Sequence, residues 1–555
     1  MDATDSRAKE VIRRAGQMAS VRAPWEAQWQ EIAELMRPMR ADFAGKIAGG
    51  QKRTSRIFDG TALMALDAFS AGLSGQITSP ANEWFALSHN DDALADDHQV
   101  KLWLAFATKR MRTAFAANGG RFYMKVQELY ADLAAFGTAP FYLEPMAPGG
   151  DIFFSSRHLE ECLIAENRWE QVDTLFRRFP MTAKIAIEQF GDAVSPAIRK
   201  AAAENPDQEF AFIHAVLPNP DYAPGRELDR VRGRAFASWY VEVETCRVVE
   251  AGGYRRFPYQ VPRWSTASRG LYGDAPAFLA LPDTKMENAM ARATIVAAQK
   301  AIDPPILAQD ERGFRPVNFQ PGKVVYSGID EQGRARYAPL QTDAKLQLGF
   351  EIEEQRRNAI REAFYHSLML MIAQPNQTAT EVLARQEEKL KLLGPPLGRI
   401  QAEFLDPLIE TVFNLLLRAG EFPAMPEPML RHALAQGRGA LDLKIEYVSP
   451  LARLQKAAPA AAVDRFLQPL LPLAQLKPET IDLIDVDKVV GVYADAFGVP
   501  PEVMRDPREV AKLRKGREAQ ARMQQLAAAA QPAAQAAQAV ESLANAQATR
   551  AGAAA

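Results

Sequence analysis

Residues 283–302 read DTKMENAMARATIVAAQKAI, and residues 343–367 read DAKLQLGFEIEEQRRNAIREAFYHS. Small and apolar side chains of the first segment recur at the helical spacing i, i+4, i+7 and i+11, namely Met286, Met290, Ala293 and Ala297. This stripe is narrow, which suits packing against neighbouring helices better than enclosing a core. The second segment is charged nearly all round from Glu351 to Arg361. Each segment predicts a helix of roughly 30 Å, at about 1.5 Å per residue.

The chain between these two helices has a different pattern. Asp303 is followed by Pro304 and Pro305, and proline lacks the amide donor that a helix needs and disfavours helix in the residue before it. Residues 306–341 then alternate Gly-containing turns with short strand-like runs such as residues 323–326. The sequence therefore predicts two long helices that carry a small β-containing knob at their far end.

The composition is that of an ordinary globular chain. Its 555 residues are 48% hydrophobic and 24% charged, which is enough for roughly three or four structural units. The formal net charge of −2 argues against a protein that grips nucleic acid statically, because such binding needs many unopposed Lys and Arg side chains. Cys162 and Cys246 lie far apart without metal-ligand spacing, so we expect a reducing compartment and no zinc site. No signal peptide or membrane span is expected.

Helices dominate the N-terminal part of the chain. Residues 5–36, 60–77 and 94–117 are predicted to be helical, with Pro24 at a first-turn position before an apolar stripe. The basic connector that follows the first helix, residues 37–56, is most simply a solvated loop, with nucleic-acid contact as the alternative.

Strands are predicted between residues 139 and 265, where short apolar runs alternate with turns. Residues 210–217 are apolar on both faces, which is typical of a covered central strand. Ala251-Gly252-Gly253 predicts a hairpin turn. Residues 441–447 alternate like a further strand, which we expect to rejoin the same sheet. The predicted fold class is α+β, mainly α.

The C-terminal third returns to helices. Thr378-x-x-Glu381 is a capping-box pattern that begins a third long helix, and Gly394-Pro395-Pro396 is expected to break or kink it. Residues 450–520 are predicted to be helical, with prolines at the joints. From Arg522 onward the chain is rich in Ala and Gln, a composition that supports a weak helix or disorder but no core of its own.

Motifs of enzymatic chemistry are missing from the sequence. GxxxxGK[ST], HExxH and GxSxG do not occur, so an ATP-driven motor, a zinc protease and a serine hydrolase are not expected. The histidines show no ligand spacing, and His214 is interpreted as a hydrogen-bonded core residue because it lies in an apolar strand. We therefore expect no enzyme activity, no metal and no cofactor.

Several short motifs resemble one known family. In chain order they are Trp29-x-x-Ile32-Ala33, Arg56-Ile57-Phe58-Asp59-Gly60-Thr61-Ala62, Ser79-Pro80-x-x-x-Trp84-Phe85, Phe136-Gly137-Thr138-Ala139, Ala165-Glu166-Asn167, Arg263-Trp264, Leu271-Tyr272-Gly273-x-x-Pro276, Thr378-Ala379-Thr380-Glu381-Val382, Leu393-Gly394-Pro395 and Tyr447-Val448-Ser449-Pro450-Leu451-Ala452. In this order, over residues 5–520, the chain resembles the head-to-tail connector (portal) proteins of short-tailed bacteriophages. The alanine-rich tail lies outside the resemblance.

The resemblance implies a ring subunit with a wing, a two-helix stem, a clip at the end of the stem and a helical crown. The segments are the wing 1–275, the first stem helix 276–303, the clip 304–341, the second stem helix 342–367, the channel (tunnel) loop 368–377, a long wing or crown helix with a returning strand 378–449, the crown 450–521 and the tail 522–555. The independently predicted helix pair and knob agree with the stem and clip.

The function implied is that of a portal at one capsid vertex of the virion, assembled in the host cytoplasm. Such rings, usually dodecamers, pass double-stranded DNA without sequence specificity during packaging and ejection. The implied partners are the terminase large subunit, a tail adaptor protein, the major capsid protein and the scaffold. No contact with a membrane is implied. The alternatives are an internal scaffold or core protein and another component of the packaging machinery, such as a nuclease or an ATPase.

Candidate channel residues follow from this arrangement. Gln374, Asn376 and Gln377 are uncharged polar groups in the tunnel loop that could meet phosphates without holding them. On the second stem helix, Glu353 precedes Arg357 by one turn and favours a surface ion pair. Arg361 has no acid at i−3 or i−4, so it is expected to face the channel.

The clip is the expected docking surface for terminase and tail. Its exposed arginines lie among turns, and they are Arg312, Arg315, Arg334 and Arg336. The simpler interpretation, that these charges only keep a β knob soluble, has equal weight.

Overall fold

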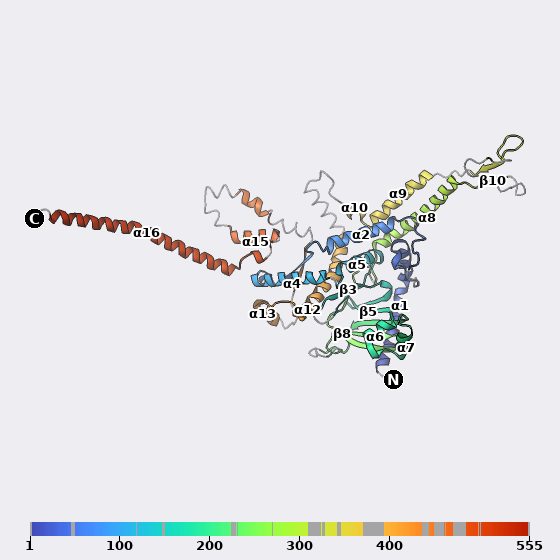
Figure 1. The fold of residues 1–555 in the computed structure, drawn as a ribbon, viewed down its shortest axis with the longest axis horizontal. Coiled ribbons are helices and arrows are strands. Elements are labelled where there is room, and N and C mark those ends of the chain that lie inside the picture. Colours follow the sequence, from blue (N-terminus) through green and yellow to red (C-terminus); the bar gives the residue numbers. More distant parts are fainter. Residues whose placement is uncertain are drawn as a thin grey trace. The chain divides into compact units, whose positions relative to one another are not determined.

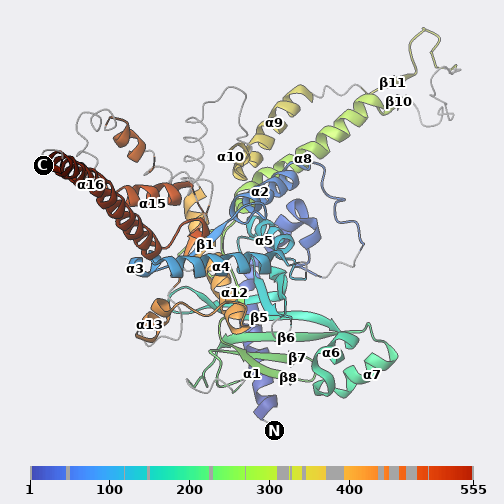
Figure 2. The ribbon, with the colours of Figure 1, turned by 60° about the vertical axis from the view of Figure 1, so that its left-hand side comes forward.

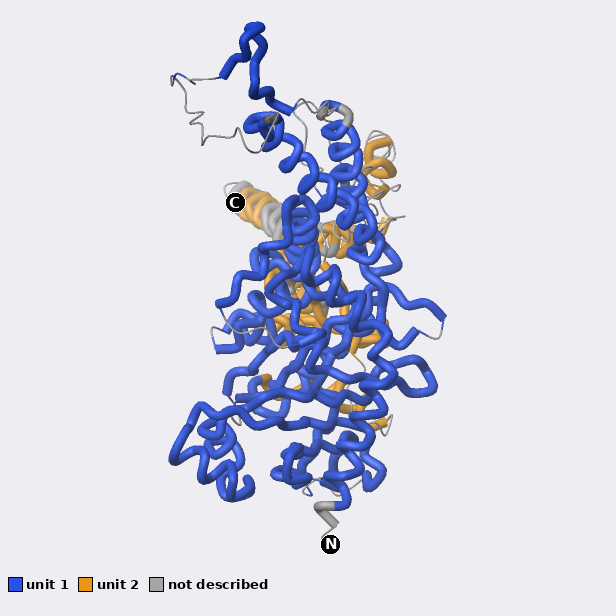
Figure 3. Tube along the Cα trace, turned by 90° about the vertical axis from the view of Figure 1, so that its right-hand side faces the viewer, with its two compact units in different colours: residues 1–84, 110–421 blue, residues 85–109, 422–555 orange. Residues whose placement is uncertain are grey.

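The computed structural model describes residues 3–45, 50–117, 119–146, 150–223, 229, 231–268, 270–308, 324, 328–340, 346–369, 393–435, 443–448, 460, 462–469, 484–497, 499 and 501–552. Two compact units are present (Figure 3), residues Met1–Trp84 with Arg110–Glu421, and residues Phe85–Lys109 with Phe422–Ala555. Helices predominate and the strands form small sheets, which confirms the mainly helical α+β class.

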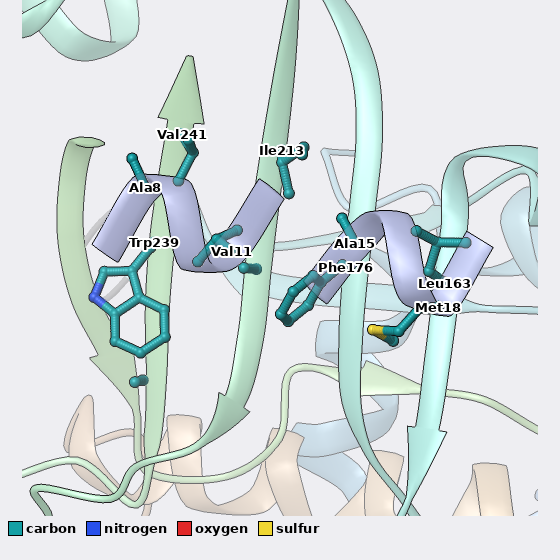
Figure 4. Close-up of a cluster of buried hydrophobic side chains, with 11 residues drawn as sticks. Ala8, Val11, Ala15, Met18, Leu163, Phe176, Ile213, Trp239 and Val241 are labelled. Carbon is teal, nitrogen blue, oxygen red and sulfur yellow. The ribbon is translucent and has the colours of Figure 1, made fainter. Parts of the chain in front are cut away.

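A five-stranded antiparallel sheet in the order β4-β5-β6-β7-β8 lies in the first unit. Its strands are β4 Cys162–Glu166, β5 Val172–Thr182, β6 Glu209–Pro218, β7 Phe236–Glu242 and β8 Arg247–Tyr254. One face packs on α1 (Ala3–Met36), whose Ala8, Val11, Ala15 and Met18 lie against it (Figure 4). The other face packs on α6 (Ala183–Phe190) and α7 (Pro196–Glu204), which lie beside the sheet in Figure 2.

Strand β6 confirms the predicted covered central strand. It pairs with β5 on one side and β7 on the other. Because side chains alternate along a strand, Ile213 packs among residues under α1, whereas Phe212 packs among residues under α6 and α7. Both side chains are buried. The apolar character of both faces therefore reflects helices on both sides of the sheet.

Two local predictions were wrong. Ala251-Gly252-Gly253 lies inside β8 and pairs with β7, and the chain turns instead at residues 243–246. Glycine at position 253 allows β8 to approach the backbone of β7 and does not serve a turn. A Cβ there would lie 2.5 Å from the Phe236 carbonyl oxygen. Pro24 lies within α1 and not in its first turn. The helix continues through it, although proline removes one hydrogen bond.

A second layer of the first unit joins helices to a three-stranded sheet in the order β3-β2-β9. The elements are η1 Pro38–Arg40, α2 Thr61–Ile77, α5 Phe122–Phe136, β2 Phe141–Pro145, β3 Ile152–Ser156, β9 Tyr259–Gln260, the π-helical turn η4 Gln401–Leu405 and α12 Asp406–Arg418. The short helices η2 Leu159–Glu161 and η3 Gly191–Ala193 belong instead with the large sheet, where η2 contacts β4 and β5 and η3 contacts α6. Residues 393–400 are helical and lead into η4, so Gly394-Pro395-Pro396 lies in the first described turn of this helix. Residues 370–392, which include the capping box, lie outside the described part.

The predicted helix pair is present in the first unit. Helices α8 (Pro276–Ile302) and α9 (Leu346–Ala363) pack along one another. Beyond them lies the short ladder of β10 (Ile306–Ala308) and β11 (Tyr337–Pro339), as Figure 1 shows. The helix α8 already begins at Pro276 and includes Pro282, whereas the apolar periodicity marked it only from Asp283. It ends before Pro304, as proline requires.

The second unit contains β1 (Phe85–His89) and β12 (Leu443–Tyr447), which form a two-stranded antiparallel sheet. The strand expected to join the large sheet therefore pairs elsewhere, and that expectation was wrong. The remaining elements are α3 Asp92–Ala95, α13 Glu427–Ala435, α15 Val486–Phe497, η6 Pro501–Val503 and α16 Pro507–Gly552, with α4 His98–Ala116 shared between the two units. The helix α16 crosses residues 521 and 522 without a break, because Ala and Gln are good helix formers.

Candidate channel stem and docking site

The helix pair α8 and α9, the expected stem, holds the loop that precedes α2. Asn288 of α8 accepts hydrogen bonds through Oδ1 from the backbone amides of Phe58 (2.7 Å) and Asp59 (3.4 Å). Its Nδ2 donates to the Arg56 carbonyl at 2.9 Å. Asp59 in turn accepts from the Thr61 amide at 2.9 Å, which stabilises the start of α2. The motif of residues 56–62 is therefore anchored to the first stem helix.

Arg357 joins the second stem helix to the same loop. Its Nε lies 3.0 Å from Asp59 Oδ2 and 3.0 Å from Glu287 Oε1, and its Nη2 lies 3.3 Å from Glu353 Oε2. Glu287 and Glu353 are nearly inaccessible, with 1% and 3% of their side chains exposed. The predicted Glu353–Arg357 pair is confirmed, but it is part of a buried cluster of one arginine and three carboxylates.

This cluster shifts the ionisation of Glu287. Burial raises the pKa of Glu287 to about 7, opposed by Arg357 and reinforced by the negative charges of Asp59 and Glu353. Neither Glu287 oxygen accepts a well-directed hydrogen bond from the described residues. The single Arg357 guanidinium is thus shared among more carboxylates than it can neutralise.

The other stem arginines also have acidic partners. Arg356 Nη1 lies 2.9 Å from Asp283 Oδ1 of α8. Arg361 Nη1 lies 3.2 Å from Glu354 Oε1 and donates to Asn358 Oδ1 at 2.9 Å. Arg361 has no acid at i−3 or i−4, as the sequence shows, but Glu354 at i−7 lies two turns away on the same face and pairs with it. The expected place of Arg361 in the channel stays a prediction.

The chain leaves the stem through a constrained turn. Phe364 is fully buried, and Tyr365 has a left-handed backbone (φ 54°) and stacks on Phe69 with ring centroids 5.7 Å apart. The short helix α10 (His366–Met369) follows, and Met369 lies so close to Gly72 of α2 that a Cβ there would be 2.8 Å from its sulfur. The expected channel residues Gln374, Asn376 and Gln377 lie outside the described part of the chain.

The segment expected to be the clip, residues 304–341, is described in part. A turn at Asp330–Gly333 is closed by the Arg334 amide, which donates to Asp330 Oδ1 at 2.7 Å. Arg334 and Arg336 are exposed, and no ion pair is found for either among the described residues. The described part of this segment also exposes apolar side chains, namely Ile306, Leu307, Val324, Ile329 and Leu340. Arg312 and Arg315 fall outside the described residues.

Several of the recognised motifs meet in the interior. Arg263 is 1% exposed and forms ion pairs with Glu166 and, at 2.9 Å, with Glu403 of the π-helical turn. Gly137 (φ 72°) and Gly273 approach so closely that a Cβ on either would overlap the other's backbone, and the Gly273 amide donates to Thr138 Oγ1 at 2.8 Å. The residues of these motifs therefore serve packing. The sequence did not reveal that Arg263 pairs with Glu166 and Glu403, or that Gly137 packs against Gly273.

Metal ligands, membrane-spanning helices and a reactive histidine would be further signs of function. The described residues contain no group of three His, Cys, Asp or Glu side chains placed to hold a metal ion. No helix among them is long and apolar enough to cross a membrane. His214 is a buried core residue as predicted, with Nδ1 2.8 Å from the Tyr259 hydroxyl and Nε2 3.0 Å from the Ser238 hydroxyl. Burial lowers the pKa of His214 to about 3.

Comparisons with known proteins agree with this architecture. The family described as "Bacteriophage head to tail connecting protein" matches residues 8–504. The chain is 33% identical over 530 residues to the "Probable portal protein" of Bordetella phage BPP-1, and 29% identical over 535 residues to the "Portal protein" of Salmonella phage epsilon15. Each alignment covers 94% of this chain and 93% of the relative. The chain belongs to the family of bacteriophage head-to-tail connecting proteins.

Proposed function

We propose that this portal protein assembles into a closed ring at one vertex of a phage capsid and forms the channel through which double-stranded DNA enters and leaves. The observation that carries the proposal is the family match over residues 8–504, with relatives that cover nearly the whole chain. A dodecamer is the subunit number that the resemblance implies. The ring assembles in the host cytoplasm and remains in the virion.

The paired charges of the stem fit a channel through which DNA slides. Arg356, Arg357 and Arg361 each have an acidic partner within 3.3 Å. A duplex is a dense polyanion, and unopposed arginines along its path would bind phosphates and retard it. Neutralised arginines present both signs of charge and let DNA move. Arg361 faces the lumen in this proposal, because its partners Glu354 and Asn358 lie on its own helix, so that its side chain joins no other element among the described residues.

The narrowest part of the channel is assigned to residues 368–377. Met369, the second residue of this segment, is packed against α2, so the loop starts from a fixed point. Gln374, Asn376 and Gln377 would meet phosphates with neutral amide groups. Deletion of residues 375–377 should leave ring assembly intact and reduce DNA retention, whereas full retention would move the constriction elsewhere.

The clip is proposed as the docking surface for the terminase large subunit and later for the tail adaptor. Arg312, Arg315, Arg334 and Arg336 supply its positive charge. The exposed apolar side chains of the same segment support this, because a ladder of two short strands cannot bury them alone. The major capsid protein and the scaffold are expected to contact other surfaces.

Clip docking is tested by reversing charge. Arg334→Glu with Arg336→Glu should weaken binding of terminase without changing ring mass. Lys184→Glu with Arg247→Glu is the matched control, because both of those cations are exposed on the large sheet and its helix. Equal binding by both variants would remove the clip assignment.

The whole proposal is tested on the purified chain. Mass photometry and negative-stain electron microscopy should show closed rings, and ATP hydrolysis should stay at background because we propose a structural role without a cofactor. A monomer at every concentration, or robust ATP hydrolysis by the chain alone, would overturn the proposal.

A further inference from the structure

One face of the C-terminal helix carries a row of cations. Arg508, Lys512, Lys515 and Arg522 of α16 are all exposed. Their spacing of i, i+4, i+7 and i+14 places them within about 80° of one another around the helix, at roughly 100° per residue. The row spans about 21 Å at 1.5 Å per residue. We call these four residues the basic stripe.

The side chains of the basic stripe have no acidic partner among the described residues, unlike those of the stem. The structure pairs Arg514, on another face of α16, with Asp487 of α15 through two contacts of 2.6 Å. Arg514 lies about 120° around the helix from Arg508. The face held against α15 is therefore different from the face that bears the stripe.

The stripe is not explained by helix stability. Arg508 with Lys512, and Lys512 with Lys515, are like-charge pairs at i, i+4 and i, i+3, and such pairs disfavour a helix. The acids Glu509 and Glu518 lie to either side of the stripe and form no ion pair with it in the described structure. Four neighbouring cations that form no ion pair within the described part of the chain are complementary to a polyanion.

We propose that the basic stripe of α16 binds the phosphate backbone of double-stranded DNA without sequence specificity. This inference rests on the proposed function, which brings a duplex to this protein, but it assigns a contact separate from the stem. A duplex carries one charge per about 1.7 Å of its axis, so phosphates are available along the whole length of the stripe. Contact with four phosphates would give a slope of about −3.6 for log K against log salt, a loss of roughly 150-fold for a fourfold rise in salt.

The probe is a covalently closed circular duplex, which cannot thread through a closed ring and so reports contacts outside the channel. Binding to the full-length protein is measured by electrophoretic mobility shift at several salt concentrations. The test variant changes all four stripe residues to Gln, a good helix former, and circular dichroism checks its helix content. The control variant removes the same charge from exposed cations of the first unit, namely Lys184, Arg199, Lys200 and Arg247.

The test variant should bind the circle at least tenfold more weakly at low salt and with a shallower salt slope, whereas the control variant should bind as the wild type does. Equal loss in both variants would show a net-charge effect and overturn the proposal. Unchanged binding in the test variant, or loss of its ring mass in photometry, would also overturn it, the latter by assigning the stripe to a subunit contact. Absence of rings in the wild type would instead contradict the proposed function.

Discussion

Asp59 and Arg357 lie 298 residues apart in the sequence and form an ion pair of 3.0 Å between Oδ2 and Nε. The pair joins the loop before α2 to the second stem helix, while Asn288 joins the same loop to the first. Three segments distant in the chain are thus fixed at one point.

Arg357→Met should lower the free energy of unfolding by about 3 kcal/mol, because it leaves the buried carboxylates of Glu287 and Glu353 without a counter-charge. This value is at the low end of the loss of stability expected when a buried ion pair is broken, because the Arg357 side chain is itself 28% exposed. Urea unfolding followed by circular dichroism measures the loss. The matched control is Arg361→Met on the same helix, whose exposed pair should contribute no more than about 1 kcal/mol. Equal losses would contradict the cluster's structural role.

Glu287 should make the protein more stable as the pH falls from about 8 to 5. Its pKa in the folded state is raised to about 7, above the ordinary value of 4.5, so the folded protein takes up a proton that the unfolded chain does not. The gain is at most about 3 kcal/mol and is complete below the unfolded pKa. Glu287→Gln should abolish this part of the pH dependence, measured as the wild-type-minus-variant difference in unfolding free energy. Glu354→Gln, at an exposed acid of the neighbouring helix α9, should leave it in place.

His214 should act in the opposite direction. Its folded pKa is lowered to about 3 by burial, so below the ordinary pKa of about 6.5 the unfolded chain binds a proton that the folded protein excludes. Stability is therefore lost as the pH falls from 6.5 toward 3. His214→Gln should flatten the acid limb of the unfolding curve, although the loss of stacking on Tyr240 lowers stability at every pH. His98→Gln, at a half-exposed histidine, should keep the wild-type slope.

Much of the fold could be predicted because it depends on local pattern. The period of the stem helices, the proline stop after Asp303 and the two apolar faces of β6 are properties of a few consecutive residues, and the structure confirms them. The wrong hairpin at residues 251–253 shows where local pattern fails. Gly253 resembles a turn residue, but its lack of a side chain serves the close approach of Phe236, which only the tertiary fold brings near.

Most of the candidate site depends on distant contacts and could not be predicted. Local spacing revealed Glu353 as a partner of Arg357 but could not reveal Asp59 or Glu287, because no helical rule joins separate elements. The partner of Arg361 was missed for a related reason. Glu354 lies at i−7, beyond the i−3 and i−4 positions at which helix neighbours usually pair. The motif that contains Asp59 was recognised from the family, and the structure supplies its physical role.

Gly273→Ala should be severely destabilising. A Cβ there would overlap the Gly137 carbonyl oxygen and lie 3.0 Å from that of Ser265, and backbone atoms cannot move aside as a flexible side chain could. The Gly273 amide also donates to Thr138 Oγ1, so a shift would break a buried hydrogen bond. We expect a loss of about 3 kcal/mol or more, at or above the upper end for overpacking. The control is Gly252→Ala in β8, where no atom lies within 4 Å of the added Cβ, and stability should change by less than about 0.5 kcal/mol. Both are measured by thermal and urea unfolding, with the yield of folded protein as a second readout. If Gly273→Ala were as stable as Gly252→Ala, the contact between the two motif glycines would not be a constraint on this fold.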